Sequence, residues 1–347
     1  MLAKPAEIAP TLLAWYDAHA RDLPWRVKNG ATADPYRVWL SEIMLQQTTV
    51  ATVRTRYAAF LERWPTVADL AAADDAELMS AWAGLGYYAR ARNLLACARA
   101  VVADHGGHFP SSEAVLRALP GIGDYTAAAI AAIAFGKRAV VVDGNVARVV
   151  ARLFALAEPL PGARNVLHQL TDAITPAARA GDFAQAMMDL GAMVCTPRRP
   201  TCALCPLRPQ CSAADQGTPE AYPVKAAKVA KPQRYGTAFW IERDEKVLLV
   251  RRPAKGLLGG MRALPTGAWS DEPPGLAGAP DGIAHWRLGK ARVDHVFTHF
   301  RLQLALAIGE APRHAPDPTG EWWPIADIES AGLPTVFAKV ARLRRDA

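Results

Sequence analysis

The chain has 347 residues, of which 51% are hydrophobic and 21% are charged, a composition that excludes an intrinsically disordered protein. Its length suits two domains, and no apolar run reaches the roughly 18 residues that a membrane-spanning helix needs. The net charge of +7 favours a polyanionic partner but does not identify one. Because the N-terminal sequence lacks the apolar core and cleavage site of a signal peptide, we expect a cytoplasmic protein.

The region from about residue 8 to residue 211 has the apolar spacing of many short helices, which proline and glycine separate. One helix is indicated by apolar residues that recur at intervals of three and four: Tyr36, Trp39, Leu40, Ile43 and Met44. Glu42 lies about 60° around this helix from Trp39, at the edge of the apolar face. Taken by itself, it has the position of an ordinary surface glutamate.

Two later turns carry residues with binding or chemical potential. The segment LPGIG at 119–123 has two glycines, which allow a tight turn, and its N–H groups can hold an anion beside the next helix N-terminus. A helix–helix turn without a ligand is the alternative. Asp143 ends the apolar run 140–142 where another helix begins, which is the position of an N-cap aspartate.

Four of the five cysteines lie close together, with six, two and five residues between them: Cys195, Cys202, Cys205 and Cys211. Four neighbouring thiolates suit either a tetrahedral zinc ion or an iron–sulfur cluster. Zinc sites usually contain two short cysteine pairs, whereas this segment has a single pair separated by two residues. The fifth, Cys97, lies in an Ala-rich helix and is expected to fill the core.

The amino-acid composition changes after the cysteines. Residues 212–233 are rich in Ala, Lys and Pro and lack apolar periodicity, so this segment is predicted to be a linker. Beyond it, residues 236–242 and 246–251 predict a hairpin, and residues 293–308 form a further strand-rich run. Helices are predicted near the end of the chain: 325–329 and 335–345. The C-terminal part is therefore expected to be a mixed α+β domain.

The cysteine spacing, the LPGIG turn and the segment VDGNVARV around Asp143 together resemble the endonuclease III superfamily of helix–hairpin–helix DNA glycosylases. The segments SEIMLQQT around Glu42 and RDLPWR near the N-terminus are similar to MutY-type adenine DNA glycosylases, and the resemblance covers residues 10–345. It implies a mainly α helix–hairpin–helix glycosylase domain with a [4Fe-4S] loop, followed by an α+β nudix-like domain. The implied boundaries are these: glycosylase domain 1–213, with hairpin 113–136 and iron–sulfur loop 195–211; linker 214–233; nudix-like domain 234–347.

The resemblance also implies a chemistry, the excision of adenine mispaired with 8-oxoguanine or guanine in base excision repair. Breaking an N-glycosidic bond calls for an acid at the leaving base and a carboxylate at the cationic sugar. By resemblance Glu42 is the acid and Asp143 the carboxylate, with Asn145 and Tyr125 beside them as catalytic residues. Bifunctional relatives carry a lysine at the position of Tyr125, and a tyrosine cannot form their Schiff base. A monofunctional glycosylase is therefore expected.

Further residues take roles by the same resemblance. Those expected to line the base pocket are Arg21, Trp25, Arg26 and Gln185. Those expected to touch DNA, by wedging into the duplex or gripping its phosphates, are Gln47, Tyr87, Gly121, Ile122 and Gly123. The four clustered cysteines are expected to ligate the [4Fe-4S] cluster.

The C-terminal domain is expected to recognise 8-oxoguanine through the loop of Phe297, Thr298 and His299. The family usually has a serine at Thr298, and threonine keeps the hydroxyl but adds a methyl group. The family often has an aromatic residue where this chain has Met261 or Arg262, so this side of the 8-oxoguanine site is expected to differ from that of its relatives. The glutamate-rich catalytic box of nudix hydrolases is missing, so we do not expect this domain to hydrolyse nucleotides.

The expected partner is double-stranded DNA that contains 8-oxoguanine:adenine or guanine:adenine mispairs, and the expected protein is a monomer of the bacterial cytosol and nucleoid that binds no membrane. Two alternatives stay open. One is another glycosylase of the superfamily, acting on mismatched thymine or oxidised pyrimidines. The other is a non-catalytic iron–sulfur protein that binds DNA and senses redox state.

Overall fold

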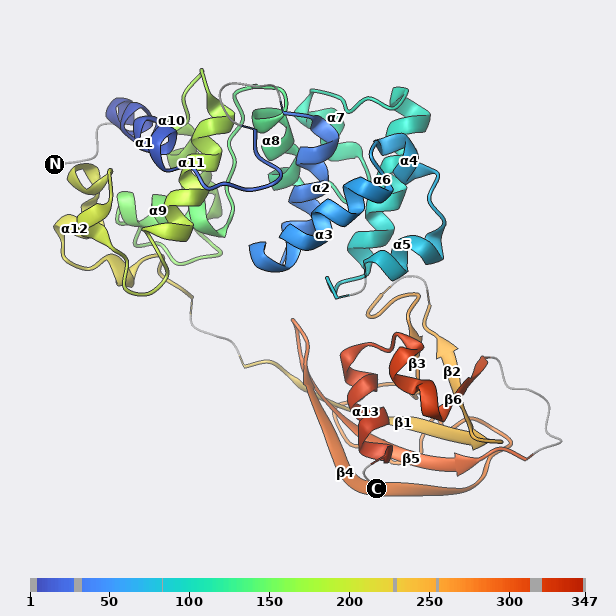
Figure 1. The fold of residues 1–347 in the computed structure, drawn as a ribbon. Coiled ribbons are helices and arrows are strands. Elements are labelled where there is room, and N and C mark those ends of the chain that lie inside the picture. Colours follow the sequence, from blue (N-terminus) through green and yellow to red (C-terminus); the bar gives the residue numbers. More distant parts are fainter. Residues whose placement is uncertain are drawn as a thin grey trace. The chain divides into compact units, whose positions relative to one another are not determined.

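The computed structural model describes residues 5–27, 33–82, 84–226, 230–253, 256–312 and 320–345. The chain divides into two compact units, Met1–Ala227 and Lys228–Ala347. The first unit is helical, and the second combines a sheet with helices, which confirms the predicted fold classes of the two parts (Figure 1). Among the described residues, no helix is both long and apolar enough to cross a membrane.

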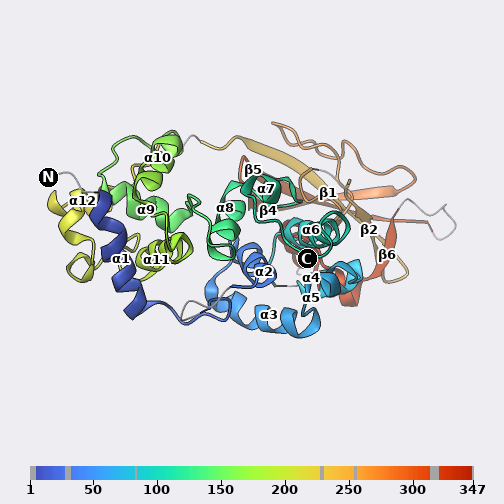
Figure 2. The ribbon, with the colours of Figure 1, turned by 90° about the horizontal axis from the view of Figure 1, so that it is seen from above.

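The helices of the first unit, in chain order, are α1 (Pro5–His19), α2 (Pro35–Leu45), α3 (Val50–Arg63), α4 (Val67–Ala71), α5 (Asp75–Ala81), α6 (Ala89–His105), α7 (Glu113–Ala118), α8 (Asp124–Ile133), α9 (Gly144–Leu153), α10 (Arg164–Ile174), α11 (Ala180–Met193), the 3-10 turns η1 (Cys202–Leu204) and η2 (Arg208–Gln210), α12 (Ser212–Asp215) and η3 (Pro219–Ala221). Figures 1 and 2 show α1 and α9 to α12 at one end of this unit and α3 to α7 at the other. Helices α2 and α8 lie between the two groups and pack against each other.

Local signals place the ends of these two central helices. Helix α2 begins where the Asp34 carboxylate accepts a hydrogen bond from the Tyr36 N–H (2.9 Å), with Pro35 at the first helical position. Helix α8 follows the LPGIG turn, in which Gly121 has a φ of 74°. A Cβ at Gly121 would lie 2.7 Å from the Cβ of Asn93, so the turn requires glycine here.

The second unit contains β1 (Gln233–Arg243), β2 (Lys246–Arg251), β3 (Arg262–Ala263), β4 (Ala284–Val296), β5 (Arg301–Glu310), β6 (Glu321–Pro324), η4 (Ile325–Ala331) and α13 (Thr335–Arg345). The predicted β1–β2 hairpin is confirmed, and its turn residues Asp244 and Glu245 both have positive φ. The strand order is β3-β2-β1-β5-β4, with β6 beside β2, and β1 runs parallel to β5. The predicted strand-rich run resolves into β4 and β5, and of the two predicted helices the first is a 3-10 segment.

The predicted linker is shorter than expected. Its first part carries α12 and η3, and the Tyr222 carbonyl accepts a hydrogen bond from Arg152 Nε (3.1 Å) of α9. The Val224 carbonyl accepts another from the Leu160 N–H (2.9 Å), so the chain is packed on the helical unit as far as residue 226. Strand β1 begins at Gln233, and residues 227–229 lie outside the described part of the chain. The anchoring partners are distant in sequence, so local periodicity does not reveal them.

Candidate active site

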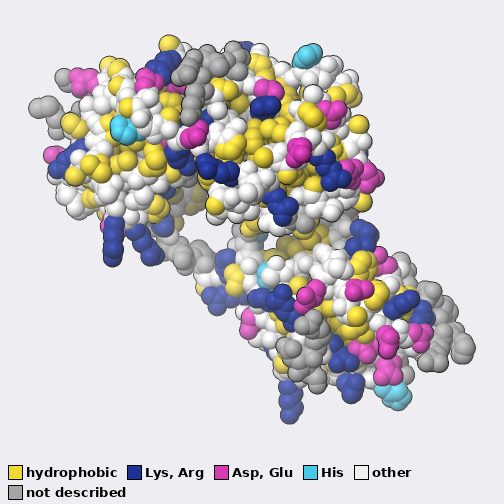
Figure 3. All heavy atoms as spheres, viewed as in Figure 1, with side chains coloured by type: hydrophobic (Ala, Val, Ile, Leu, Met, Phe, Trp, Pro, Cys, Tyr) yellow, Lys and Arg dark blue, Asp and Glu magenta, His cyan; other side chains and the backbone are white. Residues whose placement is uncertain are grey.

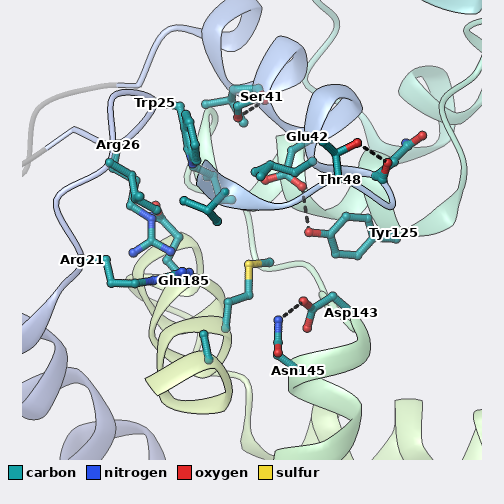
Figure 4. A pocket seen from close by; sticks show the side chains of 18 of the residues that line it. Arg21, Trp25, Arg26, Ser41, Glu42, Thr48, Tyr125, Asp143, Asn145 and Gln185 are labelled. Carbon is teal, nitrogen blue, oxygen red and sulfur yellow. Dashed lines mark hydrogen bonds between the residues drawn. The ribbon is translucent and has the colours of Figure 1, made fainter. Parts of the chain in front are cut away.

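A cavity of about 600 Å³ opens in the helical unit between its central helices, and most of the polar residues singled out in the sequence line it (Figure 4). Helix α2 contributes Glu42, α8 contributes Tyr125, and α11 contributes Gln185. The remaining predicted lining residues come from the segment before α2 and from the start of α9: Arg21, Trp25, Arg26, Asp143 and Asn145. All eight residues predicted as catalytic or base-binding therefore share one cavity wall.

Glu42 lies deeper than the sequence pattern indicates. It is 7% exposed, because α8 covers the side of α2 that the apolar spacing alone assigns to its edge. The Tyr125 hydroxyl donates a hydrogen bond to Glu42 Oε2 at 2.7 Å. Burial raises the pKa of Glu42 to about 7, against the opposing effect of the Tyr125 hydrogen bond, while the charge of Asp143 raises it further and Arg26 lowers it. At neutral pH this carboxyl is therefore partly protonated.

Asp143 is the N-cap of α9, and its carboxylate is held by two donors. Oδ1 accepts from the Val146 N–H at 2.7 Å, and Oδ2 accepts from Asn145 Nδ2 at 2.8 Å. Capping and facing the cavity are compatible, since the cap fixes the carboxylate at the cavity wall. Two carboxyl groups thus share one cavity in different surroundings, one buried against a phenol and one held by amide donors.

Tyr125 stays a neutral phenol. Burial raises its pKa well above the ordinary value of 10, and the neighbouring carboxyls Glu42 and Asp143 raise it further. The described residues that line this cavity include no lysine, so they offer no amine for a Schiff base.

The two arginines of the pocket share a partner, Asp189, that the sequence pattern alone does not reveal. Asp189 of α11 is fully buried and accepts from Arg21 Nε (2.6 Å) and from Arg26 Nη1 (2.6 Å) and Nη2 (2.8 Å). It lies one helical turn after Gln185, whose amide Nε2 reaches the Gly181 carbonyl at 3.4 Å. An acid within the apolar run AMMDLG was the available signal. Asp189 fixes both guanidinium groups at the cavity.

We expect Asp189→Asn to destabilise the helical unit by about 3 kcal/mol or more, because two arginines, one of them with a 7% exposed side chain, lose the charge that compensates their burial. Asp172→Asn is the matched control. It breaks the ion pair between Arg138 and Asp172, whose side chains are 42% and 50% exposed, and such an exposed pair contributes about 1 kcal/mol at most to stability. Urea unfolding monitored by circular dichroism measures both. Equal losses of unfolding free energy in the two variants would show that Asp189 stabilises the protein no more than an exposed ion pair does.

Helix α9 also joins the cavity to the cysteine loop. Arg148 donates to Asn145 Oδ1 (2.9 Å) and, through Nε, to the Cys195 carbonyl (2.8 Å). One turn later, Arg152 donates to Cys195 Sγ (3.3 Å) and to the Thr196 carbonyl (2.7 Å). The same helix therefore positions Asp143 at its start and the first clustered cysteine along its side.

The four clustered cysteines surround one small pocket, together with Arg152 and Arg208. Among the described residues, no group of three or more His, Cys, Asp or Glu side chains is arranged to hold a metal ion. Four thiols around a common pocket are a donor set that suits a thiolate-bound metal ion or an iron–sulfur cluster.

The two predicted wedge residues sit on loops with unusual backbone. Gln47 follows α2 and has a φ of 58°, and Tyr87 precedes α6 and has a φ of 48°. Left-handed conformations in non-glycine residues are uncommon and gather at functional sites. Tyr87 is 65% exposed, so a large part of its ring can meet a ligand, whereas Gln47 also lines the cavity. Of the LPGIG turn, Gly121 and Gly123 are exposed, while the Ile122 side chain is buried in the core.

In the second unit, Phe297, Thr298 and His299 form the tip between β4 and β5. The Phe297 N–H donates to the Phe300 carbonyl at 2.9 Å, and Thr298 and His299 are exposed. The Phe297 ring stacks on Trp269, with ring centroids 5.9 Å apart. Arg262, which stands where the family often has an aromatic residue, pairs with Glu321 at 2.5 Å and lies over the Trp323 ring. The tip of this hairpin thus exposes one hydroxyl and one imidazole group, and the aromatic rings of Phe297 and Trp269 pack beneath them.

The distribution of charged side chains on the surface does not point to one binding face. Figure 3 shows Lys and Arg side chains scattered over the viewed face of both units, with Asp and Glu side chains among them. The net charge therefore does not by itself mark a binding face.

Comparison with known proteins agrees with this architecture. The HhH-GPD superfamily of base excision DNA repair proteins matches residues 40–176, and the NUDIX domain family matches residues 237–343. The chain is 36% identical to the adenine DNA glycosylase of Homo sapiens, over 96% of this chain and 73% of the human protein. Among solved structures, a thermostable thymine-DNA glycosylase (TM-score 0.55, 31% identity) covers 61% of this chain and 97% of its own. Endonuclease III bound to DNA (TM-score 0.52, 25% identity) covers 62% of this chain and 99% of its own.

Proposed function

Since this chain belongs to the adenine DNA glycosylase family and is thus a hydrolase that cleaves N-glycosyl bonds of adenine in DNA during base excision repair, we propose that its substrate is adenine mispaired with 8-oxoguanine or guanine, released without strand cleavage. The observation that carries the proposal is the pair of carboxyl groups in one cavity. Glu42 is buried with a pKa near 7, while Asp143 is held by two donors. Such a pair divides acid and carboxylate roles between two residues.

The reaction begins with adenine turned out of the duplex into the cavity. Protonated Glu42 donates its proton to the leaving base, at N7, and the C1′–N9 bond breaks with its electron pair passing to the base. The Asp143 carboxylate stabilises or captures the cationic C1′. Glu42, now ionised, accepts a proton from the water that attacks C1′. Because the described residues of the cavity wall include no amine, the product is an abasic site in an intact strand.

The protonation of Glu42 makes the rate depend on pH. Single-turnover release of adenine should be flat in acid and fall about tenfold per pH unit above a pH near 7, because the ionised acid cannot protonate the base. In Tyr125→Phe the carboxylate loses a hydrogen bond that favours its charged form. The pKa of Glu42 then rises and the falling limb moves to higher pH. A limb that moved to lower pH would contradict this assignment.

We further assign a [4Fe-4S] cluster to the four cysteines and recognition of 8-oxoguanine to the second unit. The cluster, when bound, cross-links the loop that carries Arg198, Arg199 and Arg208, cations suited to phosphate. The exposed Thr298 hydroxyl and the His299 ring suit the polar edge of the lesion, with the aromatic cluster beneath Phe297 holding the loop. We also propose that the protein acts as a monomer in the bacterial cytosol.

The nearest competing function is removal of mismatched thymine, because the solved thymine-DNA glycosylase shares the fold at 31% identity. Duplexes with adenine opposite 8-oxoguanine and with thymine opposite guanine separate the two functions. Chromatography of the free base after one turnover should detect adenine from the first and no thymine from the second. Thymine released faster than adenine would reject the proposal.

A further inference from the structure

Arg90, in the first turn of α6, lies between the two loops that carry Gln47 and Tyr87. On one side its Nη1 donates to the carbonyls of Ile43 and Met44, each at 3.1 Å, at the C-terminal end of α2. Its Nη2 donates to the Thr48 hydroxyl at 3.1 Å. The guanidinium group therefore binds the chain on both sides of Gln47, at the end of α2 and at Thr48.

On the other side the same guanidinium group holds the loop before α6. Nη2 donates to the Leu85 carbonyl at 2.6 Å and to the Gly86 carbonyl at 3.3 Å. The cation also lies 5.6 Å from the centroid of the Tyr87 ring and 5.3 Å from that of Trp82. Trp82 Nε1 donates to the Gly86 carbonyl at 3.0 Å, so indole and guanidinium fix the same peptide.

Both loops have backbones that need such support. Gln47 and Tyr87 have left-handed φ values, and Gly84 and Gly86 in the second loop have φ of 90° and 68°. Non-glycine residues persist in that region only where surrounding contacts fix them. A direct link between the loops also exists, since Thr48 Oγ1 reaches the Leu85 carbonyl at 3.5 Å, but this is the limit of hydrogen-bond distance.

We propose that Arg90 is a positioning residue that holds the Gln47 and Tyr87 loops in one fixed arrangement, so that both side chains enter the duplex together when adenine is turned out. The inference rests on the proposed function, in which these two residues wedge into DNA. Arginine suits the task because its two Nη atoms together reach five acceptors on two segments of the chain. The three donors of lysine, on a single nitrogen, cannot span them.

The test compares Arg90→Met with Arg99→Met in the full-length protein with its cluster. Arg99 lies on the same helix and also binds backbone carbonyls, those of Ala71 (3.2 Å) and Ala73 (3.2 Å), together with the carboxylate of Asp75. It touches neither wedge loop in these contacts, so it controls for the loss of an arginine clamp on α6. The probe is a duplex with adenine opposite 8-oxoguanine and 2-aminopurine beside the adenine, whose fluorescence rises when the stack opens.

We expect Arg90→Met to slow the fluorescence rise and adenine release together, by roughly 100-fold, as for misplacement of groups by about 1 Å. The pH at which the rate falls should not change, because burial and the side chains of Tyr125, Asp143 and Arg26, rather than Arg90, set the pKa of Glu42. Arg99→Met should stay within about twofold of wild type in both measurements. A fluorescence rise in Arg90→Met as fast as in Arg99→Met would overturn the proposal. Absence of adenine release from the wild type, with a normal fluorescence rise, would instead reject the proposed function.

Two further variants cover the case in which Arg90→Met does not fold. Arg90→Lys keeps the charge and the aliphatic chain, and we expect a smaller loss of the same kind. In Tyr87→Ala combined with Arg90→Lys, the losses should not multiply, because Arg90 acts through the loop of Tyr87. Full multiplication of the two single losses would show that Arg90 acts independently and would refute the positioning role.

Discussion

Glu42→Gln lowers the single-turnover rate of adenine release by roughly 100- to 10,000-fold, the range by which general acids accelerate proton transfer. Glutamine keeps the size of the side chain and can still accept the hydrogen bond that Tyr125 donates at 2.7 Å. It cannot give up a proton to the base. The loss should therefore appear in the chemical step, while affinity for the mispaired duplex stays near that of wild type.

Glu62→Gln serves as the control, because Glu62 is an exposed glutamate on α3 that does not line the cavity. Base release is measured by rapid quench, and affinity by gel shift with a duplex that carries a non-cleavable adenosine analogue. A Glu42→Gln enzyme that released adenine at the wild-type rate would remove the acid role from Glu42. It would leave the fold and the family unaffected.

Asp143→Asn should slow base release by roughly 100- to 1,000-fold, the cost of losing one preorganised group at a site of developing charge. Asparagine is as good an N-cap as aspartate, so the hydrogen bond to the Val146 N–H can persist and α9 should stay folded. What disappears is the negative charge that faces C1′. This variant therefore separates the structural role of Asp143 from the chemical one.

A matched control for this variant is Asp74→Asn. Asp74 caps α5 by accepting from the Ala76 and Glu77 N–H groups, so the same substitution is made at another N-cap away from the cavity. Melting temperatures of both variants should lie close to wild type, and only Asp143→Asn should lose activity. Equal activity in the two variants would mean that Asp143 only caps its helix.

Much of this site was predictable because its signals are local. The apolar spacing around Trp39 predicts α2, the glycines at 121 and 123 predict the turn before α8, and an aspartate after an apolar run predicts the cap of α9. The roles of Glu42 and Asp143, however, came from resemblance. Composition and periodicity alone place Glu42 on the helix edge, whereas the structure buries it under α8.

What the sequence did not reveal depends on partners far apart in the chain. Asp189 and Arg21 are 168 residues apart, and Arg90 binds carbonyls 46 and 47 residues away. Backbone carbonyls leave no trace in side-chain patterns, so a residue such as Arg90 looks like any helical arginine. The parallel pairing of β1 with β5 and the anchoring of residues 222–226 on the helical unit escaped prediction for the same reason.

The most direct test of the central claim is single-turnover product analysis on duplexes with adenine opposite 8-oxoguanine, guanine or thymine, each resolved with and without alkali. The two carboxyl groups of the cavity, whose described lining offers no amine, predict free adenine with strand breaks only after alkali. The proposed recognition of the opposite base predicts that adenine is released fastest opposite 8-oxoguanine and least opposite thymine. Strand breaks of equal extent without alkali would contradict the account. So would failure to release adenine from any of the three duplexes by a protein that binds them tightly.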